Sequence, residues 1–314
     1  MNHETLGVGS ILGCDVAKNS IVVFDSRTGR TRTIGNHPEG LAAFAASLPP
    51  DSLVVCEATG GYEAELLMAV HAAGRAAHRA DARKVKAFIR SLGTLAKTDA
   101  IDARALARYG LERQATLPRW RPAEHQRDHL QRLVLTRRDL VATRQAWLNR
   151  AQAPGADSLH PHLTRLIEAC QHTIDAIEAD IEALLAQCRQ LAETVRTLRT
   201  IPGIGPTTAV ALLALMPELG QIKRRQAAAL AGLAPHPRQS GNCERYRRTG
   251  GGRPEVKRLL FMAALSARRH NPALRDFYQR LRANGKRPLV AIIAVMRKLV
   301  VIANAKIRSI PATI

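Results

Sequence analysis

Short runs of apolar and β-branched residues, separated by polar turns, open the chain. They occupy residues 11–16, 21–24 and 31–34, and the turns between them contain Asn19 and Gly29. Runs of this length bounded by turn-forming residues predict three consecutive antiparallel strands.

The next part of the chain alternates between strand and helix patterns. Two further strands and four helices are predicted from the spacing of apolar residues. The strands fall at residues 52–56 and 76–78, and the helices at 38–47, 62–73, 82–91 and 100–109. The order β-β-β-α-β-α-β-α, in which two helices follow the last strand, is that of an RNase H-like α/β domain, which we assign to residues 1–118.

Residues 119–198 change character and carry helical periodicity throughout. Pro154 and Gly155 divide this stretch, and apolar residues then recur at three- and four-residue steps from Leu166 to Leu185. The pattern predicts one amphipathic helix of roughly ten turns that ends near residue 198. A long helical pair between two domains favours self-association as a coiled coil, in a dimer or a tetramer. The alternative is a helical bundle within one monomer.

The last segment, residues 199–314, begins with a turn rich in glycine and proline. Residues 201–206 are typical of a helix-hairpin-helix turn, in which the backbone N–H groups of Gly203 and Gly205 approach a phosphate. An ordinary loop between two helices is the alternative. Short helices separated by Gly- and Arg-rich loops are expected to follow, so this segment is predicted to be a mostly α-helical domain.

The net charge of +21 comes almost entirely from this last part of the chain. Residues 221–314 hold 21 of the 47 Lys and Arg residues but only three of the 26 acids. Such asymmetry is typical of a surface that neutralises phosphates, so DNA is the expected partner. An incidental basic face on a soluble protein is the alternative. The residues expected to bind nucleic acid are Gly203, Gly205, Arg238, Arg245, Arg247, Arg248, Arg253 and Lys257.

Membrane and disulfide classes fit the sequence poorly. The longest apolar run, residues 289–296, ends at Arg297 and falls short of the ~18 residues that span a bilayer. No secretory signal is recognisable at the start, and the five cysteines include no C-x-x-C pair. We therefore expect a cytoplasmic, nucleoid-associated protein with no membrane partner and no zinc site.

Four carboxylates stand out in the N-terminal domain. Asp15 lies in the first apolar strand, Glu57 follows the strand at 52–56, and Asp99 and Asp102 are three residues apart on one face of a helix. The first and fourth strands of an RNase H-like sheet are neighbours, so the four side chains can converge. Taken singly, Asp99 fits a helix cap and Asp102 a solvated helix charge.

A convergent set of carboxylates predicts divalent cations, because the acids would otherwise repel one another. Mg²⁺ or Mn²⁺ prefers oxygen ligands, and two such ions about 4 Å apart can hold the attacking and leaving oxygens of a phosphodiester exchange. Cys14 and Cys56 alternate to the opposite face of their strands and are expected in the core.

These residues resemble the DEDD transposases of insertion sequences, the RNA-guided bridge recombinase family. The resemblance rests in the N-terminal domain on residues 13–18, 56–62 and 97–103. In the C-terminal domain it rests on residues 201–206, 231–235 and 239–241. It covers nearly the whole chain, and the helical middle is its least specific part.

The resemblance implies a RuvC-like domain, a coiled-coil dimerisation segment and a small transposase domain with a nucleophilic serine. It also implies a guide RNA as a partner. By this resemblance Asp15, Glu57, Asp99 and Asp102 are the metal-binding catalytic acids, and Ser240 is the nucleophile.

Ser240 lies in what reads as a small, flexible loop of the basic region. Alone, it resembles an ordinary loop serine, since a hydroxyl is a weak nucleophile unless a base or metal activates it. Tyr246 is the rival nucleophile, although the Arg/His set of tyrosine recombinases is not recognisable here. Residues 249–254 form a basic, glycine-rich loop that is expected to contact the substrate, although its three successive glycines are more than the resembling family usually has in this stretch.

The sequence thus predicts a metal-dependent transposase or recombinase that joins itself to DNA through Ser240. Two alternatives remain open. One is a RuvC-like junction nuclease in which water attacks, and the other is a non-catalytic basic DNA-binding protein.

Overall fold

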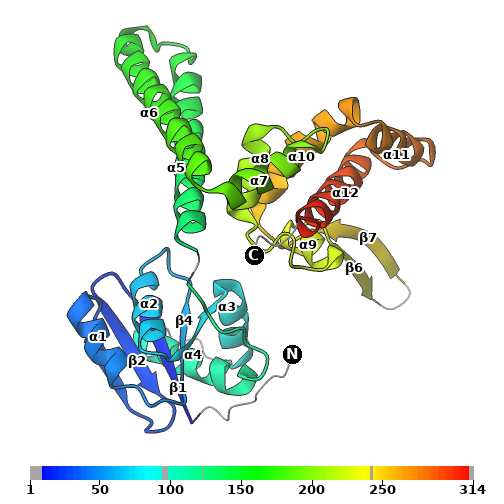
Figure 1. The fold of residues 1–314 in the computed structure, drawn as a ribbon. Coiled ribbons are helices and arrows are strands. Elements are labelled where there is room, and N and C mark those ends of the chain that lie inside the picture. The colour runs from blue at the N-terminus through cyan, green and yellow to red at the C-terminus, as the bar shows by residue number, and fades with distance from the viewer. Residues whose placement is uncertain (1–8, 94–97, 123, 241–242, 311–314) are drawn as a thin grey trace. The chain divides into compact units, whose positions relative to one another are not determined.

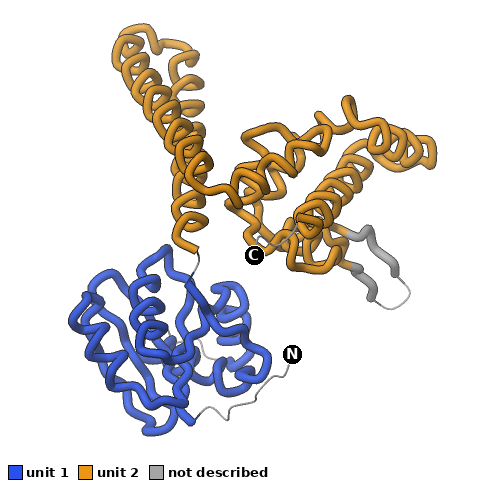
Figure 2. The backbone as a smooth tube through the Cα atoms, viewed as in Figure 1, with its two compact units in different colours: residues 1–123 blue, residues 124–314 orange. Residues whose placement is uncertain are grey.

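The computed structural model describes residues 9–93, 98–122, 124–240 and 243–310. The chain divides into two compact units, residues 1–123 and residues 124–314 (Figures 1 and 2). The division of the sequence into three parts at residues 118 and 198 stays a prediction, and the two units are described separately below.

Unit 1 is a mixed α/β domain built on a five-stranded sheet. Its elements are β1 (Ser10–Val16), β2 (Ser20–Asp25), β3 (Thr31–Gly35), α1 (Pro38–Ala46), β4 (Ser52–Glu57), α2 (Ala64–Ala72), β5 (Ala76–Ala80), α3 (Ala82–Ser91) and α4 (Asp99–Arg113). The strand order is β3-β2-β1-β4-β5, with antiparallel pairing from β3 to β1 and parallel pairing from β1 to β5. The predicted order of elements and the neighbouring first and fourth strands are confirmed.

Helices cover both faces of this sheet, α1 and α2 on one and α3 and α4 on the other (Figure 1). Cys14 and Cys56 face α1 and α2 in the first layer, as the alternation of the strands predicts. Burial raises the pKa of both thiols, that of Cys56 to about 12, so both are inert core residues. Ile11 and Val55 face α3 and α4 in the second layer.

Unit 2 begins with an antiparallel helical hairpin of α5 (His125–Ala151) and α6 (His160–Gln187), joined through the short 3₁₀ helix η1 (Asp157–Leu159). Arg137 of α5 pairs with Glu178 of α6 at 2.5 Å, and Arg144 donates to Gln171 about two helical turns further along α5. The base of α5 is buried in the main core of the unit through Leu130.

The prediction of one continuous helix to residue 198 is wrong. Cys188 is extended, with φ −118° and ψ 95°, and it separates α6 from α7 (Arg189–Arg199). Leu191 and Leu198 of α7 are fully buried in the core of unit 2. The packing of this apolar face redirects the chain, which a pattern of helical spacing does not reveal.

Among the remaining described helices of unit 2, two are short, as expected, and three are longer. They are α8 (Pro206–Leu215), α9 (Arg224–Leu230), α10 (Pro254–His270), α11 (Pro272–Ala283) and α12 (Pro288–Arg308). The strands β6 (Pro235–Ser240) and β7 (Cys243–Thr249) form an antiparallel hairpin between α9 and α10 that the sequence patterns do not predict. The unit is mostly helical, as expected.

Helix α12 is longer than the apolar run at 289–296 on which the membrane class was judged. By length and composition alone it could cross a membrane, because its mean hydropathy over 18 residues is 1.9 despite Arg297 and Lys298. Val295, Leu299 and Ala303 instead pack in the core against α10 and α11. A core helix passes the same test of length and composition as a membrane span.

Candidate active site

The register of two parallel strands sets Asp15 beside Glu57. Cys14 of β1 pairs with Cys56 of β4, and the two acids are the next residue on each strand. Neighbouring strands lie about 4.8 Å apart, and successive residues alternate between faces. The Asp15 and Glu57 side chains therefore lie on the α3–α4 face of the sheet, at the edge where β1 and β4 end. Both side chains are half-buried.

Helix α4 crosses this same face in the opposite direction to β1. A Cβ atom at Gly110 would lie 2.7 Å from Cγ2 of Ile11, and one at Gly13 would lie 2.0 Å from the carbonyl oxygen of Ala103. Moving from Ile11 to Gly13 along the strand thus means moving toward the N-terminus of the helix. Continuing in this direction along the strand, Asp15 is therefore on the side of the first turn of α4.

That first turn contains the other two predicted acids. Thr98, not Asp99, caps the helix, since its Oγ1 accepts a hydrogen bond from the backbone N–H of Ile101 at 3.3 Å. Asp99 is exposed and Asp102 is half-buried. Negatively charged side chains in the first turn of a helix interact favourably with the helix dipole.

The four acids differ in how closely the fold assembles them. Asp15 and Glu57 are strand neighbours, and Asp99 and Asp102 share a helix turn that begins over the same face. Among the described residues, no group of three or more His, Cys, Asp or Glu side chains lies close enough to hold a metal ion. All four side chains offer carboxylate oxygens, which are the ligands that a hard divalent cation prefers. A bound ion would have to bring the two pairs of acids together.

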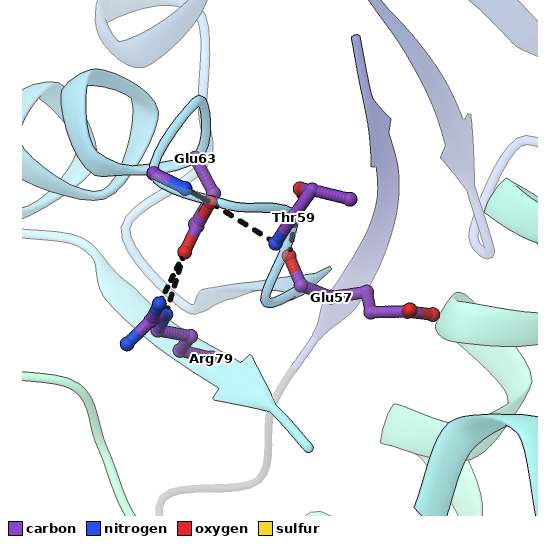
Figure 3. Close-up of polar contacts among 5 residues, drawn as sticks. Glu57, Thr59, Glu63 and Arg79 are labelled. Carbon is purple, nitrogen blue, oxygen red and sulfur yellow. Dashed lines mark hydrogen bonds and ion pairs between the residues drawn. The ribbon is translucent and has the colours of Figure 1, made fainter. Parts of the chain in front are cut away.

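A buried carboxylate that the sequence analysis missed organises the loop after Glu57 (Figure 3). Glu63 is 1% exposed, and its Oε2 accepts from the backbone N–H groups of Thr59 at 3.1 Å and Gly61 at 3.0 Å. Its Oε1 accepts from Nε of Arg79, on β5, at 2.7 Å. Burial acts to raise the pKa of Glu63, but the backbone hydrogen bonds and the Arg79 guanidinium outweigh it and hold the pKa below its ordinary range.

These contacts fix the backbone that carries Glu57. The Thr59 hydroxyl donates to the Glu57 carbonyl at 3.2 Å, and the Ala58 N–H donates to the Ala80 carbonyl at 3.1 Å. The Glu57 side chain points away from the Glu63–Arg79 pair (Figure 3). One signal was available in the sequence, because Glu63 continues the buried stripe of Leu66, Leu67 and Val70 on α2.

In unit 2 the glycine-rich turn between α7 and α8 packs closely against α10. Gly203 has φ +105°, and a Cβ there would lie 2.4 Å from Cβ of Ala267 on α10, so this position requires glycine. Gly205 is exposed at the start of α8, with open space around it. Phosphate binding by either residue stays a prediction.

Two of the cations expected to bind nucleic acid have partners within the protein. Arg253 holds both carboxylate oxygens of Glu218, at 2.8 and 2.5 Å, and donates to the Leu215 carbonyl at 2.8 Å. The Lys257 ammonium donates to the Thr249 hydroxyl at 3.2 Å. Arg253 therefore has a structural role, and its contact with nucleic acid stays a prediction.

The other predicted residues of this unit lie in the β6–β7 hairpin. Ser240 is the last residue of β6, so its backbone belongs to a strand and not to the flexible loop that was expected. Arg248 is exposed near the end of β7. The side chains of Ser240, Arg238, Arg245, Tyr246 and Arg247 lie outside the described part of the structure, so their roles stay predictions.

Comparisons with known proteins cover both units. A family model for the DEDD transposases of IS110 elements matches residues 12–154, and the model described as "Transposase IS116/IS110/IS902 family" matches residues 195–279. The chain is 30% identical over 95% of both lengths to proteins named pilin gene-inverting protein, from Moraxella lacunata and Moraxella bovis. It is also 31% identical, over 49% of this chain and 38% of the other, to an uncharacterized 43.6 kDa protein of insertion element IS110 from Streptomyces coelicolor.

Unit 1 thus has the strand order of an RNase H-like domain and the match of a DEDD transposase domain. The chain belongs to the IS116/IS110/IS902 family of transposases. It is a DNA recombinase, and its DEDD domain is of a kind that uses divalent metal.

Proposed function

We propose that this recombinase cuts and rejoins DNA strands with Mg²⁺ or Mn²⁺ held by Asp15, Glu57, Asp99 and Asp102. The observation that carries the proposal is the pairing of Cys14 with Cys56, which makes Asp15 and Glu57 neighbours beneath the helix that begins with Asp99. A bound divalent ion would supply positive charge at the scissile phosphate. The four carboxylates supply its oxygen ligands.

Ser240 is proposed as the nucleophile. Its Oγ loses the hydroxyl proton and forms a bond to phosphorus, the bond from phosphorus to the departing strand end breaks, and the departing oxygen takes up a proton. A hydroxyl end then attacks the phosphoserine and releases the serine. The energy of the original phosphodiester is conserved, whereas hydrolysis by water would discard it. The positive charge of residues 221–314 supports binding of DNA at this part of the chain.

Four further properties belong to the same proposal. A guide RNA is a second nucleic-acid partner of the basic unit. The α5–α6 hairpin mediates self-association, into a dimer or a tetramer, as a coiled coil. The protein acts in the cytoplasm at the nucleoid, and inversion of a DNA segment, for which the two Moraxella relatives are named, is among its reactions.

The proposal is tested by trapping a protein–DNA adduct. The full chain is incubated with DNA that contains element ends and with Mg²⁺, denatured, and the adduct is mapped by mass spectrometry. Ser240→Ala should lose the adduct and recombination together, whereas Ser309→Ala, a change at an exposed serine of α12's C-cap, should keep both. An adduct on Tyr246 would move the nucleophile. Persistent recombination by Ser240→Ala would favour attack by water.

Asp15→Asn tests the acidic site separately. The amide keeps the shape of the carboxylate but loses its charge, so strand cleavage should stop while affinity for nucleic acid stays. Full cleavage by this variant in Mg²⁺ would refute the metal site.

A further inference from the structure

The loop that follows Glu57 is held at several backbone positions, although it lies at the surface. Gly60 and Gly61 have φ +70° and +108°, conformations that L side chains rarely adopt. Both oxygens of the buried Glu63 are used to hold this loop and Arg79, through the bonds described above (Figure 3). The loop is therefore a preformed surface that lies directly beside a candidate metal ligand.

A second side chain joins this loop to the end of β1. The amide nitrogen of Asn36 donates to the carbonyl of Ala17 at 2.9 Å and to the carbonyl of Tyr62 at 3.2 Å. One side chain thus binds both backbones, which brings the turn that contains Lys18, the residue after Ala17, beside the loop that contains Tyr62. The carbonyl oxygen of Asn36's own side chain is buried without a hydrogen-bond partner among the described atoms. A buried polar atom without a partner costs free energy, and here it accompanies the hydrogen bonds by which Asn36 joins the two segments.

The two residues that this frame presents are an aromatic ring and a cation. Tyr62 is 50% exposed, and Lys18 is exposed on the neighbouring turn. Each comes shortly after a predicted metal ligand, Lys18 three residues after Asp15 and Tyr62 five residues after Glu57. Because half of the Tyr62 side chain is exposed, its presence here is not explained by burial in the core.

We propose that Tyr62 and Lys18 form a subsite for one unpaired nucleotide of the DNA strand that is cut. The base stacks on the Tyr62 ring, and Lys18 contacts the phosphate. Base–aromatic stacking combined with cations is how proteins bind single strands without reading sequence. The subsite rests on the proposed function, because it is the cleaved strand that the adjacent acids bring to this edge of the sheet.

The rigid frame explains why the ring stacks effectively. Ordering a mobile loop on binding costs conformational entropy, and that cost is removed when the loop is already fixed. Glu63 and Asn36 are thus positioning residues for the subsite, and neither touches the nucleotide.

Photocrosslinking tests whether DNA contacts Tyr62. The full chain in EDTA is mixed with a single-stranded DNA oligonucleotide that carries 5-iodouracil, irradiated, and digested for peptide mapping. A crosslink at Tyr62 is expected, lost in Tyr62→Ala and kept in Met68→Ala, because Met68 of α2 is also 50% exposed. Since no metal is present, the result does not depend on cleavage, and a failure of the proposed metal chemistry is recognised separately through Asp15→Asn.

Affinity measurements at raised salt provide the second readout, because salt weakens the phosphate contacts of unit 2 more than stacking. Tyr62→Ala should lower single-strand affinity by roughly five- to a hundredfold, the range for loss of one stacked base, while Tyr62→Phe stays near wild type. Lys18→Ala should reduce the slope of log affinity against log salt by about 0.7. The proposal is overturned if Tyr62 gives no crosslink to DNA, if it crosslinks only to an RNA of the same sequence, or if duplex affinity falls equally.

Discussion

Gly13 of β1 lies directly beneath the carbonyl of Ala103 on α4. A Cβ at residue 13 would be 2.0 Å from that oxygen and 2.4 Å from the backbone nitrogen of Ala107. The strand and the helix can approach this closely only because Gly13 has no side chain. This contact sets the height of α4 above the sheet, two residues before Asp15 and just after Asp102.

Gly13→Ala should therefore damage the acidic site without altering any acid. The clash is with backbone atoms that cannot rotate away, so α4 must shift, at a cost of about 1–3 kcal/mol or more. We expect a lower unfolding temperature for the transition that reports unit 1, faster hydrogen exchange in α4 and loss of cleavage. Gly250→Ala is the control for stability, because a Cβ there meets open space. Wild-type stability and activity of Gly13→Ala would show that α4 is not held by this contact.

Glu63→Gln should destabilise the loop after Glu57. Gln keeps the shape but loses the charge, and with it the strength of the hydrogen bonds from Thr59, Gly61 and Arg79. We expect a loss of about 1–3 kcal/mol in chemical denaturation near neutral pH, in the lower part of that range because Arg79 is partly exposed. Glu65→Gln, a change at an exposed residue of the same helix, should have little effect.

The pH dependence of stability gives a test specific to the charge of Glu63. The pKa of Glu63 is lower in the folded protein than its ordinary value of 4.5. Its contribution is therefore complete above the unfolded pKa and is lost as the pH falls through the folded pKa. The difference in stability between wild type and Glu63→Gln should shrink as the pH falls below 4.5. A difference that is constant down to strong acid would contradict the ion-pair role.

A comparison of Arg253→Ala with Arg248→Ala should distinguish a structural arginine from one that contacts phosphate. Arg253→Ala leaves Glu218 without its fork of hydrogen bonds, so it should lower the stability of unit 2 by about 1–3 kcal/mol with little change in salt dependence. Arg248→Ala should leave stability unchanged and reduce the salt slope of DNA affinity by about 1. Salt titrations and thermal unfolding of both variants decide the assignment, and a reversed pattern would exchange their roles.

Divalent metal should stabilise unit 1 if the acids bind it. Since the ion binds the folded state, Mn²⁺ at 100 times its dissociation constant contributes about 2.7 kcal/mol, and the unfolding temperature rises accordingly. Asp15→Asn and Asp102→Asn should lose most of this rise, whereas Glu65→Gln should keep it. An equal rise in all four proteins would place the metal elsewhere.

The sequence by itself determined the elements of unit 1 and their order. The period of two in β1 and β4 assigned Cys14 and Cys56 to the core and Asp15 and Glu57 to the opposite face, because alternation is a property of the strand backbone. The charge of residues 221–314 likewise needs no fold, and it indicates nucleic acid directly.

The tertiary structure decided which residues meet across long separations. Helical spacing continues through Cys188, and only the core that receives Leu191 and Leu198 makes the chain turn there. Arg253 reads as a free cation until Glu218 is placed opposite it. Glu63 reads as an ordinary carboxylate of the predicted helix at 62–73 until β5 brings Arg79 to it. Each of these pairings depends on the packing of apolar faces distant in sequence, which local propensity does not encode.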